Sequence, residues 1–204
     1  MRGRAVEAGT LSAAALLGAV VVVGAASPVP AIELRPSREL IQAALERGRA
    51  AAAARTPPDR LYAWFGSEQE LEPKGFLMTK VIGLTVMSAH FALRGETPSE
   101  AEIRQVLDEP ALLVSLVIFG DRPDFAQDSY VVMTQGARAI KPVKVRFDGQ
   151  APRSPAWPKR PAFRAKVVAA FAYADFDPQA HTTISVFPPA GGEVAFALDF
   201  SAIP

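Results

Sequence analysis

Residues 163–200, FRAKVVAAFAYADFDPQAHTTISVFPPAGGEVAFALDF, contain three β-rich segments in succession, at 163–173, 182–187 and 194–200. Valine, isoleucine, threonine and phenylalanine are frequent in these segments, and they favour extended structure. The connections at 177–178 and 188–192 contain proline and glycine, which end strands and form turns. This part of the chain therefore predicts consecutive strands joined by short loops.

Further segments of the same character precede this stretch. They are residues 77–93, 112–119, 129–134 and 140–147. A chain of seven short strands with few helices is typical of an antiparallel β-sandwich of the immunoglobulin-like type, which is the fold class that we expect. The alternative is an α+β domain in which the N-terminal helix covers a single antiparallel sheet.

Two short helices are predicted outside the strands. Ser37 is a good N-cap, and the apolar residues after it recur at helical spacing, which predicts a helix over 38–54. Thr97 and Glu100 have the spacing of a capping box, which predicts a helix over 98–108. We expect the first helix to lean on a sheet, because its apolar stripe is narrow.

The first 31 residues have the three regions of a secretory signal peptide. Arg2 and Arg4 precede an apolar run at 11–26, and small residues with two prolines follow the run. Cleavage is expected after Ala31, with Ala26 as the alternative, and the product would be periplasmic or secreted. The competing interpretation is a single N-terminal membrane anchor, but a spanning helix needs about 20 apolar residues.

The sequence predicts three parts of the chain. They are the signal peptide at 1–31, an N-terminal helix with an aromatic and acidic connector at 32–74, and the β-sandwich domain at 75–204. The chain contains no cysteine, which excludes disulfides, thiol nucleophiles and thiolate metal sites. Arginine greatly outnumbers lysine, a composition that we expect of a GC-rich bacterial genome.

Positive charge is concentrated in one segment of the chain. Residues 138–166 hold nine basic residues and a single acid, whereas residues 167–204 hold four acids and no lysine or arginine. Side chains alternate between the two faces of a strand. In 140–147 and 163–167 we therefore expect the apolar side chains on the inner face and the cations on the outer face. If these strands form a hairpin, one outer face carries Lys144, Arg146, Arg164 and Lys166.

The loop between these strands adds further basic residues and a tryptophan. The candidate binding residues are therefore Lys144, Arg146, Arg153, Trp157, Lys159, Arg160, Arg164 and Lys166. Such a surface attracts anionic polymers, the head groups of a membrane surface, or another exported protein. Nucleic acid is not expected, because Trp157 is the sole aromatic residue among these bases. The competing interpretation is an ordinary solvated face, with Trp157 pinning its own loop.

No known catalytic motif is present in the sequence. The patterns Gly-x-Ser-x-Gly and His-Glu-x-x-His and a glycine-rich phosphate loop are all absent. The sequence therefore predicts no cofactor and no metal, and it favours a non-enzymatic binding protein over an enzyme. The alternative is a hydrolase or lyase in which a carboxylate works with a histidine. Its candidate residues are Asp121, Asp124, Asp175, His90 and His181.

Overall fold

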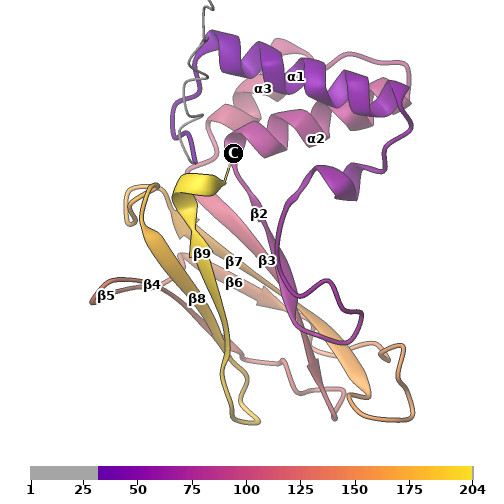
Figure 1. Cartoon of the computed structure of the whole chain (residues 1–204), viewed down its shortest axis with the longest axis vertical. Helices are drawn as coiled ribbons and strands as arrows, with labels where there is room; N and C mark the ends of the chain where they lie inside the picture. Colours follow the sequence, from indigo (N-terminus) through magenta and orange to yellow (C-terminus); the bar gives the residue numbers. More distant parts are fainter. Residues whose placement is uncertain (1–31, 204) are drawn as a thin grey trace, which may run out of the picture.

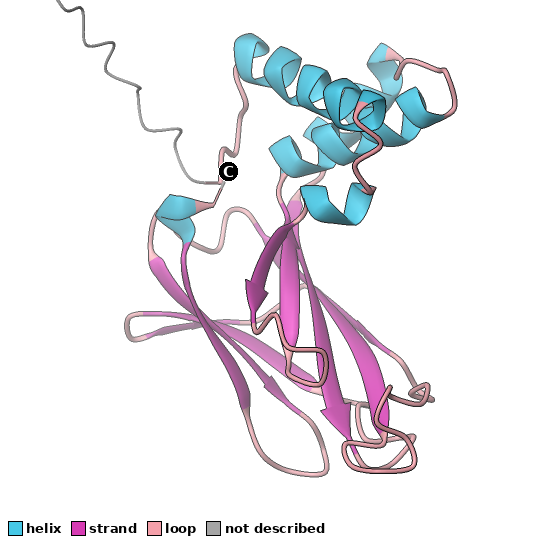
Figure 2. Ribbon diagram, turned by 45° about the vertical axis from the view of Figure 1, so that its right-hand side comes forward, coloured by secondary structure: helices cyan, strands magenta, loops and turns pink. Residues whose placement is uncertain are grey.

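The computed structural model describes residues 32–203, which form two antiparallel sheets and three α-helices (Figure 1). The predicted signal peptide at 1–31 lies outside the described residues. The α-helices gather beyond one end of the sheets, and long loops occupy the other end (Figure 2). No helix in the described part is long and apolar enough to cross a membrane.

The described residues contain nine strands in two sheets. The first sheet has the order β1 (Ala63–Gly66), β2 (Lys74–Met78), β3 (Ala111–Gly120), β7 (Phe163–Ala172) and β6 (Lys144–Phe147). The second has the order β5 (Arg138–Ile140), β4 (Tyr130–Gln135), β8 (His181–Phe187) and β9 (Val194–Asp199). The helices are α1 (Arg38–Ala53), α2 (Lys80–Leu93), α3 (Glu100–Leu107) and the 3-10 helices η1 (Pro58–Leu61) and η2 (Phe200–Ala202).

One hydrophobic core connects the inner faces of the two sheets. Leu112 and Leu116 of β3 and Phe171 of β7 are fully buried in it, together with Met133 of β4 and Ile184 of β8. Alternate side chains of a strand point to opposite faces, and one face of each sheet packs into this core. The prediction of a mainly β protein with antiparallel strands is confirmed.

The predicted strand at 77–93 is wrong, because most of this stretch is helix α2. The side chain of Thr79 is the N-cap, and its Oγ1 accepts the N–H of Ile82 at 3.2 Å. Buried residues lie on most sides of α2, including the polar Thr85 and Ser88. A helix that is buried all round lacks the one-sided pattern of a surface helix. Tertiary burial therefore overrides the β propensity of its threonine and valine residues.

Helix α1 packs on α2 and not on a sheet, which corrects the expected position of this helix. The two helices approach closely at Gly48, where a Cβ atom would lie 2.2 Å from the backbone oxygen of Thr85. Beside this point, Ser88 Oγ donates a hydrogen bond to the backbone oxygen of Leu45 at 2.6 Å. The alternative fold, a single sheet covered by the N-terminal helix, is therefore wrong.

The predicted strand at 140–147 is also interrupted. Its first part, β5, pairs with β4 in the second sheet, whereas β6 pairs with β7 in the first sheet. Pro142 lies between them, and it has no N–H to donate to a neighbouring strand. It therefore fits the position where the chain passes from the second sheet to the first. After the crossing, the N–H of Val143 donates to the backbone oxygen of Ala170 at 2.8 Å.

The predicted helix at 98–108 is confirmed as α3, but the capping box predicted at Thr97 and Glu100 is wrong, because Ser99 and Glu102 form the box. The N–H of Glu102 donates to Ser99 Oγ at 3.3 Å, and Glu102 Oε2 accepts the N–H of Ser99 at 2.6 Å. These hydrogen bonds lower the pKa of Glu102, with the backbone N–H of Ser99 as the largest cause.

We expect Ser99→Ala to lower the free energy of unfolding by about 1 kcal/mol at neutral pH, because one helix N–H loses its acceptor. The pKa of Glu102 is lower in the folded state, so the box stabilises the fold above the unfolded pKa. That stabilisation is lost as the pH falls through the folded pKa. Urea unfolding at pH 7 and at about pH 3 should show a smaller difference from wild type at acidic pH, and an undiminished difference would contradict the coupling.

Candidate functional site

Four exposed cations of β6 and β7 lie on one face of the first sheet. Arg146 lies opposite Val168 in the β6–β7 pair, and Lys166 is two residues from Val168 along β7. Paired residues, and residues two apart on one strand, point to the same side of a sheet. We call this group the basic face, and it consists of Lys144, Arg146, Arg164 and Lys166. The predicted hairpin and shared face are confirmed, while a role in binding stays a prediction.

The basic face has no acidic partner within the described part of the chain. None of its four cations lies within 4.0 Å of a carboxylate oxygen of residues 32–203. Asp148 follows β6 directly, but its Oδ2 accepts the backbone N–H of Lys166 at 2.8 Å. Unneutralised charges of one sign create a local potential that attracts anions.

The four candidates in the loop at 148–162 make contacts of their own. The guanidinium of Arg153 lies 3.9 Å from the ring centre of Trp157, so it covers a face of that ring. Arg160 pairs with Asp121, with 3.4 Å between Nε and Oδ2. Lys159 is exposed in the same loop. These contacts support the interpretation that Trp157 stabilises its own loop.

The groups required by the enzyme alternative do not come together in residues 32–203. Neither histidine lies within 4.0 Å of any of the three predicted carboxylates, and the nearest acid to His181 is Asp199, at 4.0 Å. His90 is exposed on α2. Asp124 is bound by both Nε and Nη2 of Arg122, at 3.0 and 2.7 Å, and these hydrogen bonds lower its pKa. Within this part of the chain, Asp121, Asp124 and Asp175 therefore form no acid–base pair with His90 or His181.

The loop after β7 contains two carboxylates, Asp175 and Asp177, whose spacing predicts either a calcium site or a turn in which Asp177 accepts backbone N–H groups. The structure shows the turn. Asp177 Oδ1 accepts the N–H of Gln179 at 2.9 Å, and Gln135 Nε2 donates to the backbone oxygen of Asp177 at 2.8 Å. No group of three or more metal-ligating side chains is found in the described residues.

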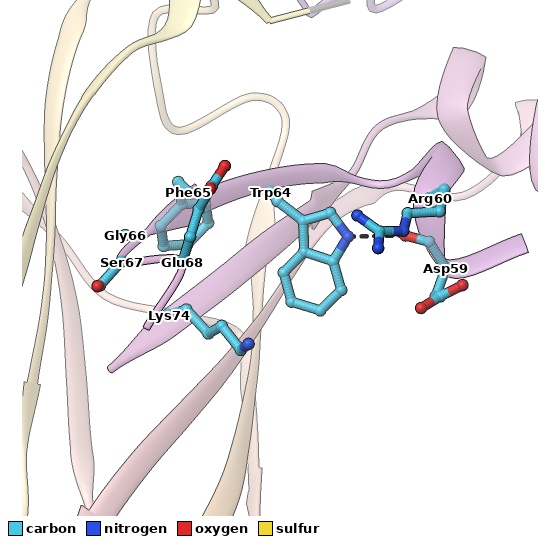
Figure 3. Close-up of a pocket in the computed structure, with 8 residues that line it drawn as sticks. All are labelled: Asp59, Arg60, Trp64, Phe65, Gly66, Ser67, Glu68 and Lys74. Atoms are coloured by element: carbon cyan, nitrogen blue, oxygen red, sulfur yellow. Dashed lines mark hydrogen bonds between the residues drawn. The ribbon is translucent and has the colours of Figure 1, made fainter. Parts of the chain in front are cut away.

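A pocket of about 580 Å³ lies at the opposite edge of the first sheet, around Trp64 (Figure 3). We call it the Trp64 pocket, and it is lined by Asp59, Arg60, Trp64, Phe65, Gly66, Ser67, Glu68 and Lys74. Trp64 pairs with Phe76, and Lys74 is two residues from Phe76 along β2. Trp64 and Lys74 therefore point to one side of the sheet.

The strand register places this pocket on the same side of the sheet as the basic face. Lys74 of β2 lies opposite Val117 of β3, and Val117 lies opposite Lys166 of β7. Neighbouring strands are about 4.8 Å apart, so the backbones of Lys74 and Lys166 are separated by about 10 Å. One side of the first sheet thus carries an aromatic pocket at β1 and β2 and the basic face at β6 and β7.

Aromatic contacts hold the indole of Trp64 in place. Its Nε1 donates to the backbone oxygen of Asp59 at 2.7 Å, and its ring meets Phe76 edge-on with 5.1 Å between ring centres. Phe76 in turn stacks on Tyr62 at 4.3 Å. The sequence predicts that the aromatic cluster at 61–66 plugs the core. Ala63 and Phe65 do pack against the core, but Trp64 lies outside it on the edge strand β1. The alternation of Trp64 and Phe65 is the local signal that could have indicated this.

Comparisons with known proteins identify no family for this chain. No protein-family model matches it, and no curated protein matches its sequence. Among solved structures, it is similar to the archaellum periplasmic stator protein complex of FlaF and FlaG from Sulfolobus acidocaldarius, with 14% identity and a TM-score of 0.28 over 44% of this chain and 77% of that chain. The FlaG stator protein from the same organism has 14% identity and a TM-score of 0.29, over 45% and 88%. TM-scores this low do not establish a shared fold or function.

Proposed function

We propose that this chain is an exported, non-enzymatic binding protein with an immunoglobulin-like sandwich, and that its basic face binds an anionic polymer. The observation that carries the proposal is four exposed cations on one sheet face without an acidic partner in residues 32–203. Their strands are about 4.8 Å apart. Since charge attraction extends over about 10 Å at 0.1 M salt, the four cations act on a ligand together.

A linear polymer suits this arrangement better than a lipid surface does. Lys144 and Arg146 are two residues apart on β6, and Arg164 and Lys166 are two residues apart on β7. That spacing repeats charges about every 6.6 Å along each strand. A chain with regularly spaced negative groups can therefore contact several cations at once. An anionic membrane also attracts clustered cations, but its mobile head groups have no fixed spacing that matches this repeat.

Retention on immobilised poly-L-glutamate tests the proposal. The purified protein is expected to bind at low salt and to elute as the salt approaches about 0.15 M, because exposed charges are screened. Lack of retention at low salt and neutral pH would mean that the basic face is an ordinary solvated surface. Binding to vesicles of phosphatidylglycerol without binding to poly-L-glutamate would reassign the ligand to lipid head groups.

Export is the second part of the proposal, and it predicts a mature N-terminus at Ile32. The Ile32 side chain is 1% exposed within the core, and its backbone nitrogen donates to the oxygen of Ile203 at 3.1 Å. A new α-ammonium group at this position can keep that hydrogen bond, so cleavage there is compatible with the fold. Sequencing of secreted protein from its N-terminus checks this. Intact Met1 on membrane-bound protein would contradict cleavage, and a start at Ser27 would move the site to Ala26.

A further inference from the structure

We infer that the Trp64 pocket binds a sugar ring, so that the polymer on the basic face is an acidic polysaccharide of the uronate type. The inference rests on the proposed function and narrows its ligand class. Aromatic surface, cations and carboxylates occur together in this pocket. Its volume of about 580 Å³ lies within the usual range of small-molecule sites, about 300 to 1,000 Å³.

Trp64 supplies a preorganised apolar surface. The side chain is 45% exposed, although its indole N–H already donates to the backbone oxygen of Asp59. The exposed part is therefore aromatic carbon, whose contact with water is unfavourable. The C–H face of a pyranose ring is apolar and flat, and it covers such a surface. Because Phe76 holds the indole edge-on, little conformational freedom is lost when a ring stacks there.

Charged groups of both signs surround this aromatic surface. Arg60 and Lys74 supply cations, and Asp59 and Glu68 supply carboxylates. None of these four side chains forms an ion pair with another described residue. Sugar hydroxyls can donate to the carboxylates, while the acid group of the sugar accepts from the cations. A polyanion without hydroxyls has no donor for Asp59 and Glu68, so repulsion by these carboxylates would offset the attraction of Arg60 and Lys74.

A continuous row of paired residues connects the pocket with the basic face. Trp64 of β1 lies opposite Phe76, Phe76 opposite Ser115, Ser115 opposite Val168, and Val168 opposite Arg146. The row crosses five strands, a distance of about 19 Å. The middle positions are Phe76, Ser115 and Val168, and Ser115 is buried, so a chain that follows the row passes over the half-buried Phe76 and Val168. The spacing allows one polysaccharide chain to place a ring on Trp64 and acid groups on the basic face.

The test compares oligogalacturonate with poly-L-glutamate of equal carboxylate number, using the full-length secreted protein and titration calorimetry. We expect Trp64→Ala to weaken oligogalacturonate binding about tenfold, which corresponds to about 1.4 kcal/mol, and to leave poly-L-glutamate binding unchanged. Trp157→Ala is the matched control, because Trp157 is 44% exposed but the guanidinium of Arg153 lies 3.9 Å from its ring centre, whereas Lys74 Nζ is 5.8 Å from the ring centre of Trp64. That variant should bind both polymers as the wild type does.

A second measurement avoids dependence on the folding of the alanine variant. In Trp157→Phe protein, Trp64 is the remaining tryptophan, and its fluorescence should change on adding oligogalacturonate but not poly-L-glutamate. Equal responses to both polymers, or equal losses in Trp64→Ala and Trp157→Ala, would overturn the sugar site and leave the proposed function standing. Tight binding of neutral cellohexaose through Trp64, without binding of either anionic polymer, would overturn both.

Discussion

A variant with glutamine at all four positions of the basic face is expected to bind poly-L-glutamate about a hundredfold more weakly than the wild type. Each exposed ion pair contributes about 0.2 to 1 kcal/mol. At about 0.7 kcal/mol each, four pairs contribute about 2.8 kcal/mol, which corresponds to about a hundredfold. The free energy of unfolding should stay within about 1 kcal/mol of the wild type, because these side chains are exposed and unpaired in the described part. Salt-dependent retention and urea unfolding measure the two quantities.

The control for this variant removes the same amount of charge elsewhere. Four exposed arginines near or on α1 are suitable for replacement with glutamine, namely Arg35, Arg38, Arg47 and Arg55. This control should keep most of the binding, because its cations are not on the basic face. Equal losses in both variants would show that net charge, and not the arrangement on the first sheet, attracts the polymer.

Gly48→Ala is expected to lower the free energy of unfolding by about 3 kcal/mol. In the interior of a helix the same change ordinarily stabilises, by about 0.5 to 1 kcal/mol. The sign reverses here because the new Cβ atom would lie 2.2 Å from Thr85 O and 2.8 Å from Ala89 N. Both atoms belong to the backbone of α2, so the whole helix must shift. The shift would also strain the hydrogen bond from Ser88 to Leu45.

Urea unfolding of Gly48→Ala beside Gly149→Ala checks this prediction. No atom lies within 4 Å of the Cβ position of Gly149, so its replacement should change the free energy of unfolding by less than about 0.5 kcal/mol. A stabilised Gly48→Ala protein would contradict the close packing of α1 on α2.

The sequence pattern predicted correctly those helices and strands that depend mainly on residues close together in the chain. The predicted strand at 163–173 is β7, whose residues 163–167 alternate as a half-buried strand requires, whereas residues 169–171 are all buried. Ser37 caps α1 as predicted, since the cap depends on a residue three positions later. The shared face of Arg146 and Lys166 followed from the same alternation once their strands paired.

Contacts between residues far apart in the chain determined the features that the sequence pattern did not predict. Helix α2 contains threonine and valine residues that favour strands in isolation, but packing against α1 buries them as a helix. Trp64 and Lys74 share a sheet face with the basic face only because β2 and β3 lie between β1 and β7 and join them in one sheet. The sequence of a single strand does not indicate which strands will lie beside it in the sheet.

The sequence by itself determined that this chain is rich in antiparallel strands, that it relies on a core without disulfides, and that a single segment carries the excess of positive charge. These properties depend on composition and on the alternation of neighbouring side chains. Only the tertiary structure decided how the strands divide between two sheets and which aromatic residues lie beside the cations. The physical reason is that strand pairing joins residues far apart in the chain, and burial of the whole core selects among the possible pairings.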